Sequence, residues 1–317
     1  MAPVETSRRP LLLLDSASLY FRAFYGVPES VRAPDGTPVN AVRGLLDIVA
    51  RLVVTRGPAR MVACWDDDWR PAFRVAAIGS YKAHRVGADG GEEVPPALAA
   101  QVPVIVEVLA ALGIARVGAP GFEADDVIGT LAGRERARPA AERAPVEVVT
   151  GDRDLFQLVD DSGPVRVLYT GRGMADLDVV DQARLAERHG TPTGAAYADA
   201  SILRGDASDG LPGVAGIGDK TAAALVARYG SLDGVLAAVA AGDPGLTATQ
   251  ARRLADAADY LAVAPGVVRV ARDVPVGEVA DALPTEPADP AALAALTERW
   301  GLTTSVARLR DAIAAVG

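Results

Sequence analysis

The chain has 317 residues and a net charge of −9 at neutral pH, and half of its residues are apolar. These values predict a folded protein of one large domain or two smaller ones and exclude a disordered chain. No apolar run is long enough to span a membrane, and Leu11–Leu14 is too short for the core of a signal peptide. The single cysteine, Cys64, excludes an internal disulfide and a cysteine-rich zinc site, so we expect a cytoplasmic protein.

The negative net charge argues at first against a nucleic-acid partner, because proteins that bind phosphates are usually basic. The positions of the charges matter more than their sum. Lys82 and Lys220 are the only two lysines, and arginine supplies every other basic side chain except the histidines. A lysine that persists in such an arginine-rich chain indicates a position where arginine does not serve. Both lysines fall inside motifs described below.

Short apolar runs alternate with helix-like segments in the first half of the chain. The runs, rich in branched residues, are 9–15, 59–66, 113–118, 145–152 and 164–170; the helix-like segments include 40–55, 96–112 and 122–136. This alternation predicts a mostly parallel sheet with helices on both faces. Residues 70–95 combine basic and aromatic side chains with a Gly-rich acidic stretch, Gly87–Glu93, which is typical of a mobile arm rather than of core.

The strand pattern fades from about residue 175 onward. Helices are predicted at 179–188, 194–204, 219–229, 231–241, 247–263, 290–299 and 304–315. The glycines of 242–245 and the Pro-rich stretch 284–290 are the predicted joints. We therefore expect an α/β core over residues 1–175 and a helical region over residues 176–317.

Nine acidic residues from five segments form the first candidate site. They are Asp15, Asp66, Glu123, Asp125, Asp126, Asp152, Asp154, Asp206 and Asp209. Asp15, Asp66 and Asp152 come at the ends of the first, second and fourth predicted strands, and functional residues gather at the carboxyl ends of parallel strands. Glu123 and Asp126 are three residues apart, so they share a face if their segment is helical. Taken singly, each acid also fits a surface position or a helix start.

Carboxylates from so many segments would repel one another unless cations lay among them. Oxygen ligands without histidine or thiolate partners favour Mg²⁺ or Mn²⁺ over zinc, and neither His84 nor His189 has ligand spacing. Paired divalent ions ~3.5–4 Å apart suit the attack of water on a phosphodiester. Such ions would also let a polyanion approach an acidic protein.

Residues 205–231 form a second candidate site, in which two helices flank a glycine turn. The turn glycines and the first residues of the second helix are Gly213, Gly216, Gly218, Lys220 and Thr221, with Asp219 expected as the N-cap. The N–H groups of such a turn and of the helix N-terminus can hold a phosphate. A dinucleotide-binding loop is the alternative, but no strand runs directly into this turn. The pattern favours a helix-hairpin-helix that grips duplex backbone without reading sequence.

Six blocks of this chain, in order, resemble the 5′ nuclease family, which comprises the flap endonucleases and the 5′→3′ exonuclease domain of bacterial DNA polymerase I. The blocks are LLLLDSASLYFRAFYG, VACWD, FRVAAIGSYKAHR, GFEADDVIGTLA, VVTGDRDLFQLV and GDASDGLPGVAGIGDKTAAALVARYG, and the match spans roughly residues 10–315. The resemblance implies a PIN-like 5′ nuclease fold, a helical arch at about 70–95 and a helix-hairpin-helix (helix-three-turn-helix) at about 205–230. With no polymerase domain following, we expect a free-standing 5′→3′ exonuclease.

The resemblance also implies a role for each matching position. The first metal site would comprise Asp15, Asp66, Glu123, Asp125 and Asp126, and the second Asp152, Asp154, Asp206 and Asp209. In the arch, Lys82 and Arg85 would stabilise charge on the scissile phosphate, and Tyr81 would stack on a terminal base. Phe21 and Arg22 match positions near the 5′-terminal nucleotide. The remaining positions expected to contact DNA are Arg74, Gly213, Gly216, Gly218, Lys220 and Thr221, and carbonyls at Val214 and Ile217 would hold K⁺.

Two positions depart from the family pattern. Gly210 replaces the asparagine commonly found after the last aspartate, and Ser16 replaces a common glycine after Asp15. We expect either change to tune the activity rather than abolish it.

The leading prediction is a Mg²⁺- or Mn²⁺-dependent 5′→3′ exonuclease with flap endonuclease activity, acting by two metal ions in DNA replication and repair. The expected substrates are 5′ flaps, nicked or gapped duplexes, 5′ ends and RNA-primed ends. We expect a monomer that cooperates with a DNA polymerase and a ligase. The alternatives are a non-catalytic DNA-structure-binding protein and an RNA-directed nuclease of similar sheet architecture. The hairpin argues against the RNA-directed enzyme, because its geometry suits duplex backbone.

Overall fold

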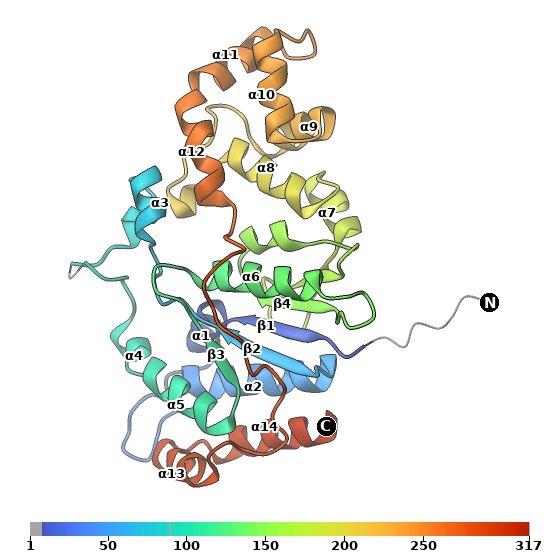
Figure 1. The fold of residues 1–317 in the computed structure, drawn as a ribbon. Helices are drawn as coiled ribbons and strands as arrows, with labels where there is room; N and C mark the ends of the chain where they lie inside the picture. The colour runs from blue at the N-terminus through green and yellow to red at the C-terminus, as the bar shows by residue number, and fades with distance from the viewer. Residues whose placement is uncertain (1–7, 89, 317) are drawn as a thin grey trace.

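A six-stranded sheet forms the middle of the molecule in the computed structural model, which describes residues 8–88 and 90–316 (Figure 1). Its strands are β1 (Leu11–Asp15), β2 (Arg60–Cys64), β3 (Ala115–Val117), β4 (Val146–Thr150), β5 (Val165–Tyr169) and β6 (Asp178–Val180). The order across the sheet is β3-β2-β1-β4-β5-β6. The first five strands are parallel, whereas β6 is antiparallel to β5. The five predicted strands and their parallel arrangement are confirmed; β6 was not predicted, because Val179 and Val180 were assigned to the start of the predicted helix at 179–188.

Helices surround the sheet and continue above it. They are α1 (Ser16–Gly26), α2 (Asn40–Arg56), α3 (Ala72–Ala77), α4 (Pro96–Ala99), α5 (Val102–Leu112), α6 (Ala124–Ala137), α7 (Gln182–His189), α8 (Gly194–Arg204), α9 (Asp219–Tyr229), α10 (Leu232–Ala241), α11 (Ala248–Asp256), α12 (Ala258–Val268), α13 (Pro290–Trp300) and α14 (Thr303–Val316). Short 3₁₀ turns are η1 (Ala83–Arg85), η2 (Asp154–Leu158) and η3 (Ala207–Asp209). The predicted helix at 247–263 is divided into α11 and α12 at Ala257.

The side-chain alternation of β1 explains why the sheet is covered on both faces. Successive residues of a strand point to opposite faces. Leu12 and Leu14 pack with α2, α5 and the C-terminal helices, whereas Leu11 and Leu13 pack with α6 and η2. All four leucines are fully buried, which is the pattern expected for a central parallel strand.

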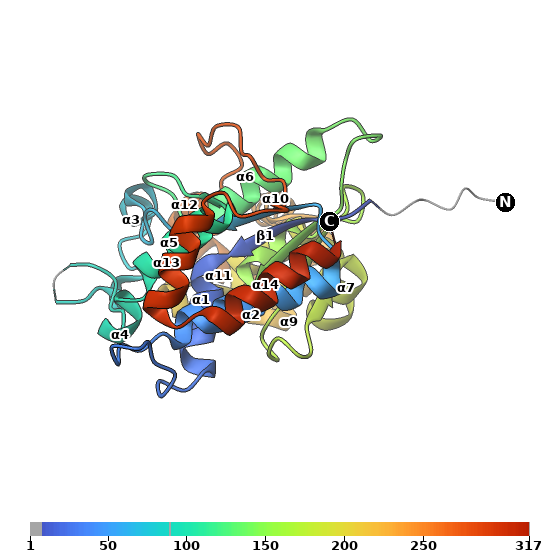
Figure 2. The ribbon, with the colours of Figure 1, turned by 90° about the horizontal axis from the view of Figure 1, so that it is seen from below.

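The C-terminal helices return to the α/β core, so the predicted assignment of residues 176–317 to one helical region is wrong. Leu302, Leu309 and Ile313 are buried in the same core cluster as α2. Figure 2 shows α14 lying along α2, with which it makes extensive contacts. Residues 281–283 lead into this return by running beside β2, where the Met61 N–H donates to the Asp281 carbonyl at 2.8 Å. Sequence pattern could not reveal the return, because an amphipathic helix shows only that it packs, not on what.

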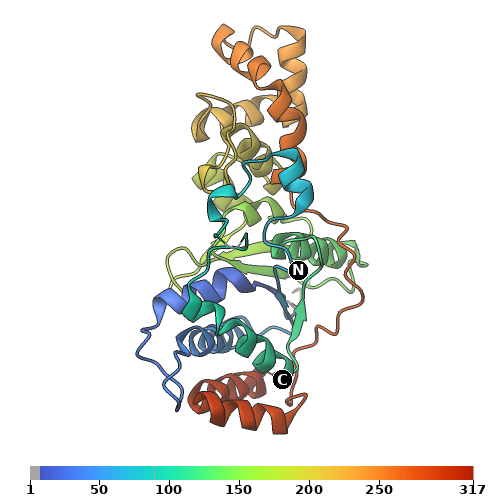
Figure 3. The same cartoon turned by 90° about the vertical axis from the view of Figure 1, so that its left-hand side faces the viewer.

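The helices α8–α12 form a separate hydrophobic cluster that stands above the sheet in the view of Figure 3. Two residues of the predicted arch, Ile78 and Tyr81, are buried in this cluster. The arch itself holds α3 and η1, and then a hairpin-like turn in which Val86 and Glu92 form an antiparallel bridge. Asp89, within the predicted acidic stretch, lies outside the described residues. Helix therefore makes up only part of the predicted arch, whose first half is packed rather than free.

The described residues contain no single helix that is both long enough and apolar enough to cross a bilayer. The helices α9 and α10 reach that length and hydropathy only as a pair, and they are bent by 80° relative to each other.

Candidate active site

A cavity of about 1020 Å³ opens at the carboxyl ends of the central strands. Asp15 is the last residue of β1, and Asp66 and Asp152 each follow the end of a neighbouring strand by two residues. Parallel neighbours deliver such residues to the same edge of the sheet. Seven of the nine predicted acidic residues line the cavity: Asp15, Asp66, Glu123, Asp125, Asp152, Asp154 and Asp206.

Hydrogen bonds between elements hold the deepest of these carboxylates in place. Asp15 caps α1 by accepting from the Ser18 N–H at 3.1 Å, and its other oxygen accepts from the Thr150 hydroxyl at 2.6 Å. Asp66 accepts from the Ala124 N–H at 2.9 Å, at the first residue of α6. The carboxylates of β1 and β2 are thus tied to β4 and α6, which carry other members of the set.

Burial and mutual repulsion make the charged state of these acids costly. Burial raises the pKa of Asp15 to about 7, and the negative charge of Asp66 adds to the effect. Burial, followed by repulsion from Asp152, raises the pKa of Asp154 to about 8. The pKa of Asp125 is also well above its usual range because of burial and the charges of Asp152 and Asp15. A nearby cation would favour the ionised form of each group.

The donor set fits hard divalent cations by its chemistry. Its predicted ligands are all carboxylates, which suit Mg²⁺ or Mn²⁺; no cysteine lines the cavity, and His84, an exposed side chain, is the one histidine among the lining residues. Within residues 8–88 and 90–316, no three acidic, histidine or cysteine side chains are already drawn together as a preformed metal site. The carboxylates therefore share one cavity but stand apart, as repulsion between like charges requires.

Asp126 has a different place from the one that the resemblance implies. Glu123 is the N-cap of α6 and Asp126 its third residue, and the two form a reciprocal capping box. The Asp126 carboxylate is fully buried, does not line the cavity, and accepts from the Arg74 guanidinium at 2.7 and 2.8 Å. Its expected role as a direct metal ligand is therefore wrong in this structure. The spacing of three residues reflects helix capping.

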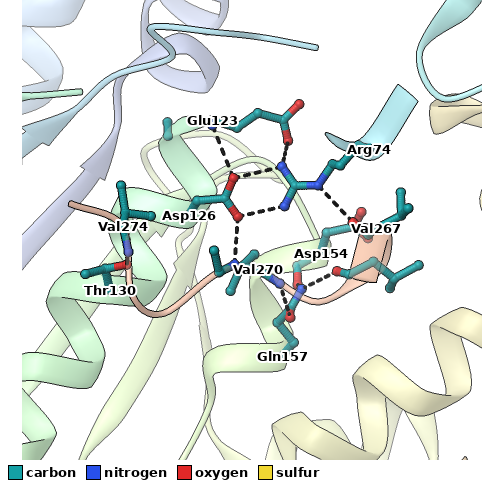
Figure 4. A network of polar contacts seen from close by, with 12 residues as sticks. Arg74, Glu123, Asp126, Thr130, Asp154, Gln157, Val267, Val270 and Val274 are labelled. Atoms are coloured by element: carbon teal, nitrogen blue, oxygen red, sulfur yellow. Dashed lines mark hydrogen bonds and ion pairs between the residues drawn. The ribbon is translucent and has the colours of Figure 1, made fainter. Parts of the chain in front are cut away.

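Arg74 is likewise not available to contact DNA as expected. Its side chain is 2% exposed and pairs with Asp126 and Glu123 (Figure 4). A guanidinium is buried only when its N–H groups are paired, and here acidic partners supply the pairing.

The predicted arch residues contact acidic groups at the cavity. The Lys82 Nζ pairs with Glu123 at 2.7 Å, and Arg85 pairs with Asp209 at 2.6 Å. Tyr81 is 3% exposed and its hydroxyl donates to Glu123, so the expected stacking on a terminal base is wrong in this arrangement. Among the described residues other than glycine, only Lys82 has a positive φ, of 47°. Lys82 and Arg85 line the cavity, whereas Asp209 does not.

Aromatic and basic residues of α1 line the mouth of the same cavity. Phe21 and Arg22 are among them, and the Arg22 Nε is buried without a hydrogen-bond partner among the described residues. Tyr25 was not predicted, although its ring stacks on Phe21 with centroids 6.5 Å apart and is 72% exposed. The i, i+4 spacing of Phe21 and Tyr25 could have indicated in the sequence that the two rings share one helix face. Other lining residues that were not predicted include Trp69, Arg153, Arg204 and the two acids Glu92 and Glu93.

The predicted helix-hairpin-helix corresponds to α8, the turn and α9. Gly218 rather than Asp219 is the N-cap, and Asp219 accepts from Arg204 at 2.9 Å. Gly213 has φ of +63°, and a Cβ there would lie 2.3 Å from the Arg204 carbonyl oxygen, so this position requires glycine. Lys220 is exposed in the first turn of α9, and Thr221 is half-buried.

The side chains of Val214 and Ile217 are buried beneath the turn. The Val214 carbonyl accepts from the Ile217 N–H at 2.9 Å, which fixes the turn between the two helices. Gly216 lies against the Arg253 guanidinium, which donates to its carbonyl at 3.1 Å. The turn is thus well defined by the contacts of its own residues.

Comparisons with known proteins place this architecture in a family. Residues 10–190 match the model of the 5′-3′ exonuclease N-terminal resolvase-like domain, and residues 192–291 match that of the 5′-3′ exonuclease C-terminal SAM fold. A 5′-3′ exonuclease of Streptomyces coelicolor is 58% identical over 96% of this chain and 100% of its own length. A DNA polymerase I of Mycobacterium bovis is 38% identical over 100% of this chain, which spans 33% of that polymerase.

The solved structures add a comparison of the fold. The flap endonuclease of bacteriophage T5, crystallised as a pseudo-enzyme–product complex with DNA and metal ions, superposes with a TM-score of 0.62 at 14% identity. The superposition covers 97% of this chain and 99% of the phage protein. The two matched domain models and the similarity over nearly the whole length of the Streptomyces coelicolor enzyme show that this chain belongs to the 5′-3′ exonuclease family.

Proposed function

We propose that the chain is a divalent-metal-dependent nuclease that removes nucleotides from 5′ ends of DNA and cuts 5′ flaps. The observation that carries the proposal is the cavity at the strand ends, which seven of the predicted carboxylates line together with Lys82, Arg85 and Arg22. Carboxylates suit the binding of Mg²⁺ or Mn²⁺, and the cationic side chains suit the binding of a phosphodiester. The non-catalytic alternative is set aside, because both exonuclease domain models match the chain and a relative that is 58% identical over 96% of it is an exonuclease.

The residues assigned to metal binding are the predicted acids that line the cavity. One group is Asp15, Asp66, Glu123 and Asp125, and the other is Asp152, Asp154 and Asp206. Asp209 belongs to the second group by the resemblance, but it does not line the cavity and pairs with Arg85. When bound, two such ions would lower the pKa of a water nucleophile and stabilise both the attacking and the departing oxygen of the phosphodiester.

The chain's own cations would position the substrate. Lys82 and Arg85 are each paired with a carboxylate of the set, Glu123 and Asp209 respectively. On substrate binding, a phosphate group would replace these carboxylates as partner of the two side chains, because charge-assisted hydrogen bonds to phosphate are of similar strength. The guanidinium of Arg22, whose Nε has no partner within the described residues, would contact the phosphate nearest the 5′ end.

The hairpin between α8 and α9 would hold the duplex backbone. The helix α9 has 11 residues, and the free N–H groups of its first turn would bind a phosphate together with Lys220 and Thr221. Backbone carbonyls at Val214 and Ile217 would bind K⁺ between the turn and a phosphate. Because these contacts are made to phosphates, we propose recognition of duplex structure rather than of base sequence.

The proposed substrates are 5′ flaps, nicked and gapped duplexes and RNA-primed ends, processed by a cytoplasmic monomer beside a polymerase and a ligase in replication and repair. The free, buried Cys64 fits a reducing compartment. The test compares the purified protein on labelled 5′-flap, nicked and gapped duplexes and on single-stranded RNA, with Mg²⁺, with Mn²⁺ and with EDTA. We expect cutting of 5′-ended duplexes that requires divalent metal. Equal cutting in EDTA, or faster cutting of the RNA than of any DNA duplex, would contradict the proposal.

A further inference from the structure

Residues 267–274, which we call the strap, lead from the end of α12 back to the α/β core without regular secondary structure after Val268. Side chains of the core take the place of backbone partners along the strap (Figure 4). The Val267 carbonyl accepts from the Arg74 Nε at 3.0 Å. The Gln157 side-chain amide donates to the Val268 carbonyl at 3.1 Å and accepts from the Val270 N–H at 2.9 Å. The Ala271 N–H donates to the Asp126 carboxylate at 2.7 Å, and the Val274 N–H donates to the Thr130 hydroxyl at 3.1 Å.

The side chains that hold the strap belong to the elements that carry the cavity's carboxylates. Asp126 and Thr130 lie on α6, which begins directly after Glu123 and contains Asp125. Gln157 lies on η2, which begins at Asp154. The strap therefore connects the helices α8–α12 to both groups of carboxylates through bonded contacts.

Arg74 lies where these connections meet. Its Nη1 donates to Glu123 and to Asp126, both at 2.8 Å, while its Nη2 donates to Asp126 at 2.7 Å. Asp126 is fully buried and Glu123 is 3% exposed, so neither carboxylate can replace the guanidinium by water without rearrangement. Since Asp126 also holds Ala271 of the strap, one guanidinium orients a cavity carboxylate and fixes the strap at the same time.

We propose that Arg74 is a positioning residue that couples the helices α8–α12 to the N-terminal end of α6, where Glu123 and Asp125 lie. Metal binding at Glu123 and Asp125 and duplex binding at the hairpin would then each strengthen the other, because both favour the arrangement that Arg74 holds. Such coupling is reciprocal by thermodynamic necessity. The inference rests on the proposed function in its assignment of Glu123 and Asp125 to metal binding.

Arg60 offers a matched control, because it also joins α6 to the chain that follows α12. Arg60, at the opposite end of β2 from the cavity, pairs with the buried Glu135 near the end of α6 and with Asp281 beyond the strap. Arg60→Met therefore breaks a part-buried pairing between α6 and the chain that follows α12, without touching the cavity. The Arg60→Met variant therefore shows how far a loss of stability alone changes Mn²⁺ binding.

The experiment measures Mn²⁺ binding from the EPR signal of free Mn²⁺, for the protein alone and with saturating dumbbell DNA. A dumbbell is a duplex closed at both ends, so it offers no 5′ end to cut. The parent is expected to bind Mn²⁺ about tenfold more tightly when the dumbbell is present, within the usual range for coupled sites. In Arg74→Met this factor should fall to within twofold of unity, whereas dumbbell affinity in EDTA stays within threefold of the parent's. Arg74→Lys keeps the charge but not the fork of donors, so its factor should lie between the two.

The outcomes separate the inference from the proposed function. A parent that binds no Mn²⁺ would contradict the proposed function itself. A parent that binds Mn²⁺ and DNA independently, an Arg74→Met protein with the parent's factor, or an Arg60→Met protein that loses the factor equally would overturn the coupling alone. If Arg74→Met does not fold, Gln157→Met removes two strap contacts and leaves Arg74 intact. A reduced factor in that variant supports the inference, and an unchanged factor overturns it.

Discussion

Gly210 lies so close to Ser80 that a Cβ at position 210 would be 2.1 Å from the Ser80 carbonyl oxygen. The Ser80 hydroxyl donates to the Gly210 carbonyl at 2.7 Å, and the Lys82 N–H donates to the Asp209 carbonyl at 2.9 Å. The segment that carries Lys82 and Arg85 is thereby docked on the loop that carries Asp206 and Asp209. The glycine that departs from the family pattern is the residue that permits this contact.

Replacing Gly210 by alanine or asparagine should displace this segment. The new side chain would meet the Ser80 carbonyl, and the φ of +71° adds strain for any residue with a Cβ. Since a misplacement of about 1 Å near the reacting groups can lower a rate ~10²-fold, we expect a loss of that order in the single-turnover rate on a 5′ flap. Gly242→Ala is the control, because Gly242 has a φ of +62° and a Cβ added there would meet nothing within 4 Å. Equal rates for the Gly210 and Gly242 variants would show that the docking has no role in cutting.

Lys82→Ala should lower the rate of the chemical step by ~10²-fold or more, the usual loss on removing one electrostatic catalyst. The Lys82 Nζ lies 2.7 Å from a Glu123 carboxylate oxygen, and 15% of the Lys82 side chain is exposed. Rapid-quench measurement under single-turnover conditions isolates this step from product release. Lys220→Ala, which changes the other lysine, should instead weaken binding and leave the saturated rate unchanged. A saturated Lys82→Ala rate within threefold of the parent's would remove Lys82 from the proposed chemistry.

Asp15→Ala and Asp152→Asn should each abolish metal-dependent cutting and preserve duplex binding. The two residues belong to different proposed metal groups, and both line the cavity. Binding is measured by fluorescence anisotropy in EDTA, where neither variant should differ from the parent by more than about threefold. Asp233→Asn, an exposed change on α10, is the control for removing one negative charge. Parent-like cutting by either cavity variant would mean that its carboxylate is not needed.

The sequence was sufficient for the parallel strands and for the acids at their ends. Asp15, Asp66 and Asp152 could be placed because parallel strands deliver their carboxyl ends to one edge, whatever the rest of the chain does. Asp126 could not be distinguished from a ligand, since an i, i+3 pair of acids at a helix start has the same spacing in a capping box. Sequence spacing is ambiguous whenever two arrangements share a period.

The burial of Arg74 and Tyr81 was beyond sequence reasoning for a different reason. The partners of Arg74 lie 49, 52 and 193 residues away along the chain. A basic, aromatic segment with glycines nearby has the composition of a surface arm, and only the packing of α12 and α6 around it turns its first half into interior. Local pattern carries no information about such distant partners.

Raising the salt concentration should weaken duplex binding steeply, and Lys220→Glu should reduce that dependence. Each phosphate neutralised by the protein contributes about −0.9 to the slope of log affinity against log salt, because condensed counterions are released. Lys220 is exposed at the N-terminus of α9, where it can add one such contact to those of the backbone N–H groups. We expect the slope to fall by about 1 in this variant. A slope equal to the parent's would exclude Lys220 from the phosphate contacts.

Tyr25→Ala should weaken the binding of flapped DNA more than that of dumbbell duplex. Tyr25 is the most exposed large apolar side chain described, and with Phe21 it forms a stacked pair at the mouth of the cavity. An exposed aromatic face beside a phosphate-binding cavity suits an unpaired base, and stacking of one base is worth ~1–3 kcal/mol. Flap affinity should therefore fall by roughly 5-fold to 150-fold, as that free energy implies. Tyr25→Phe, which keeps the ring, should bind like the parent. The outcome against the prediction is an equal loss of affinity for the flap and for the dumbbell, since that would reflect a change in duplex binding alone.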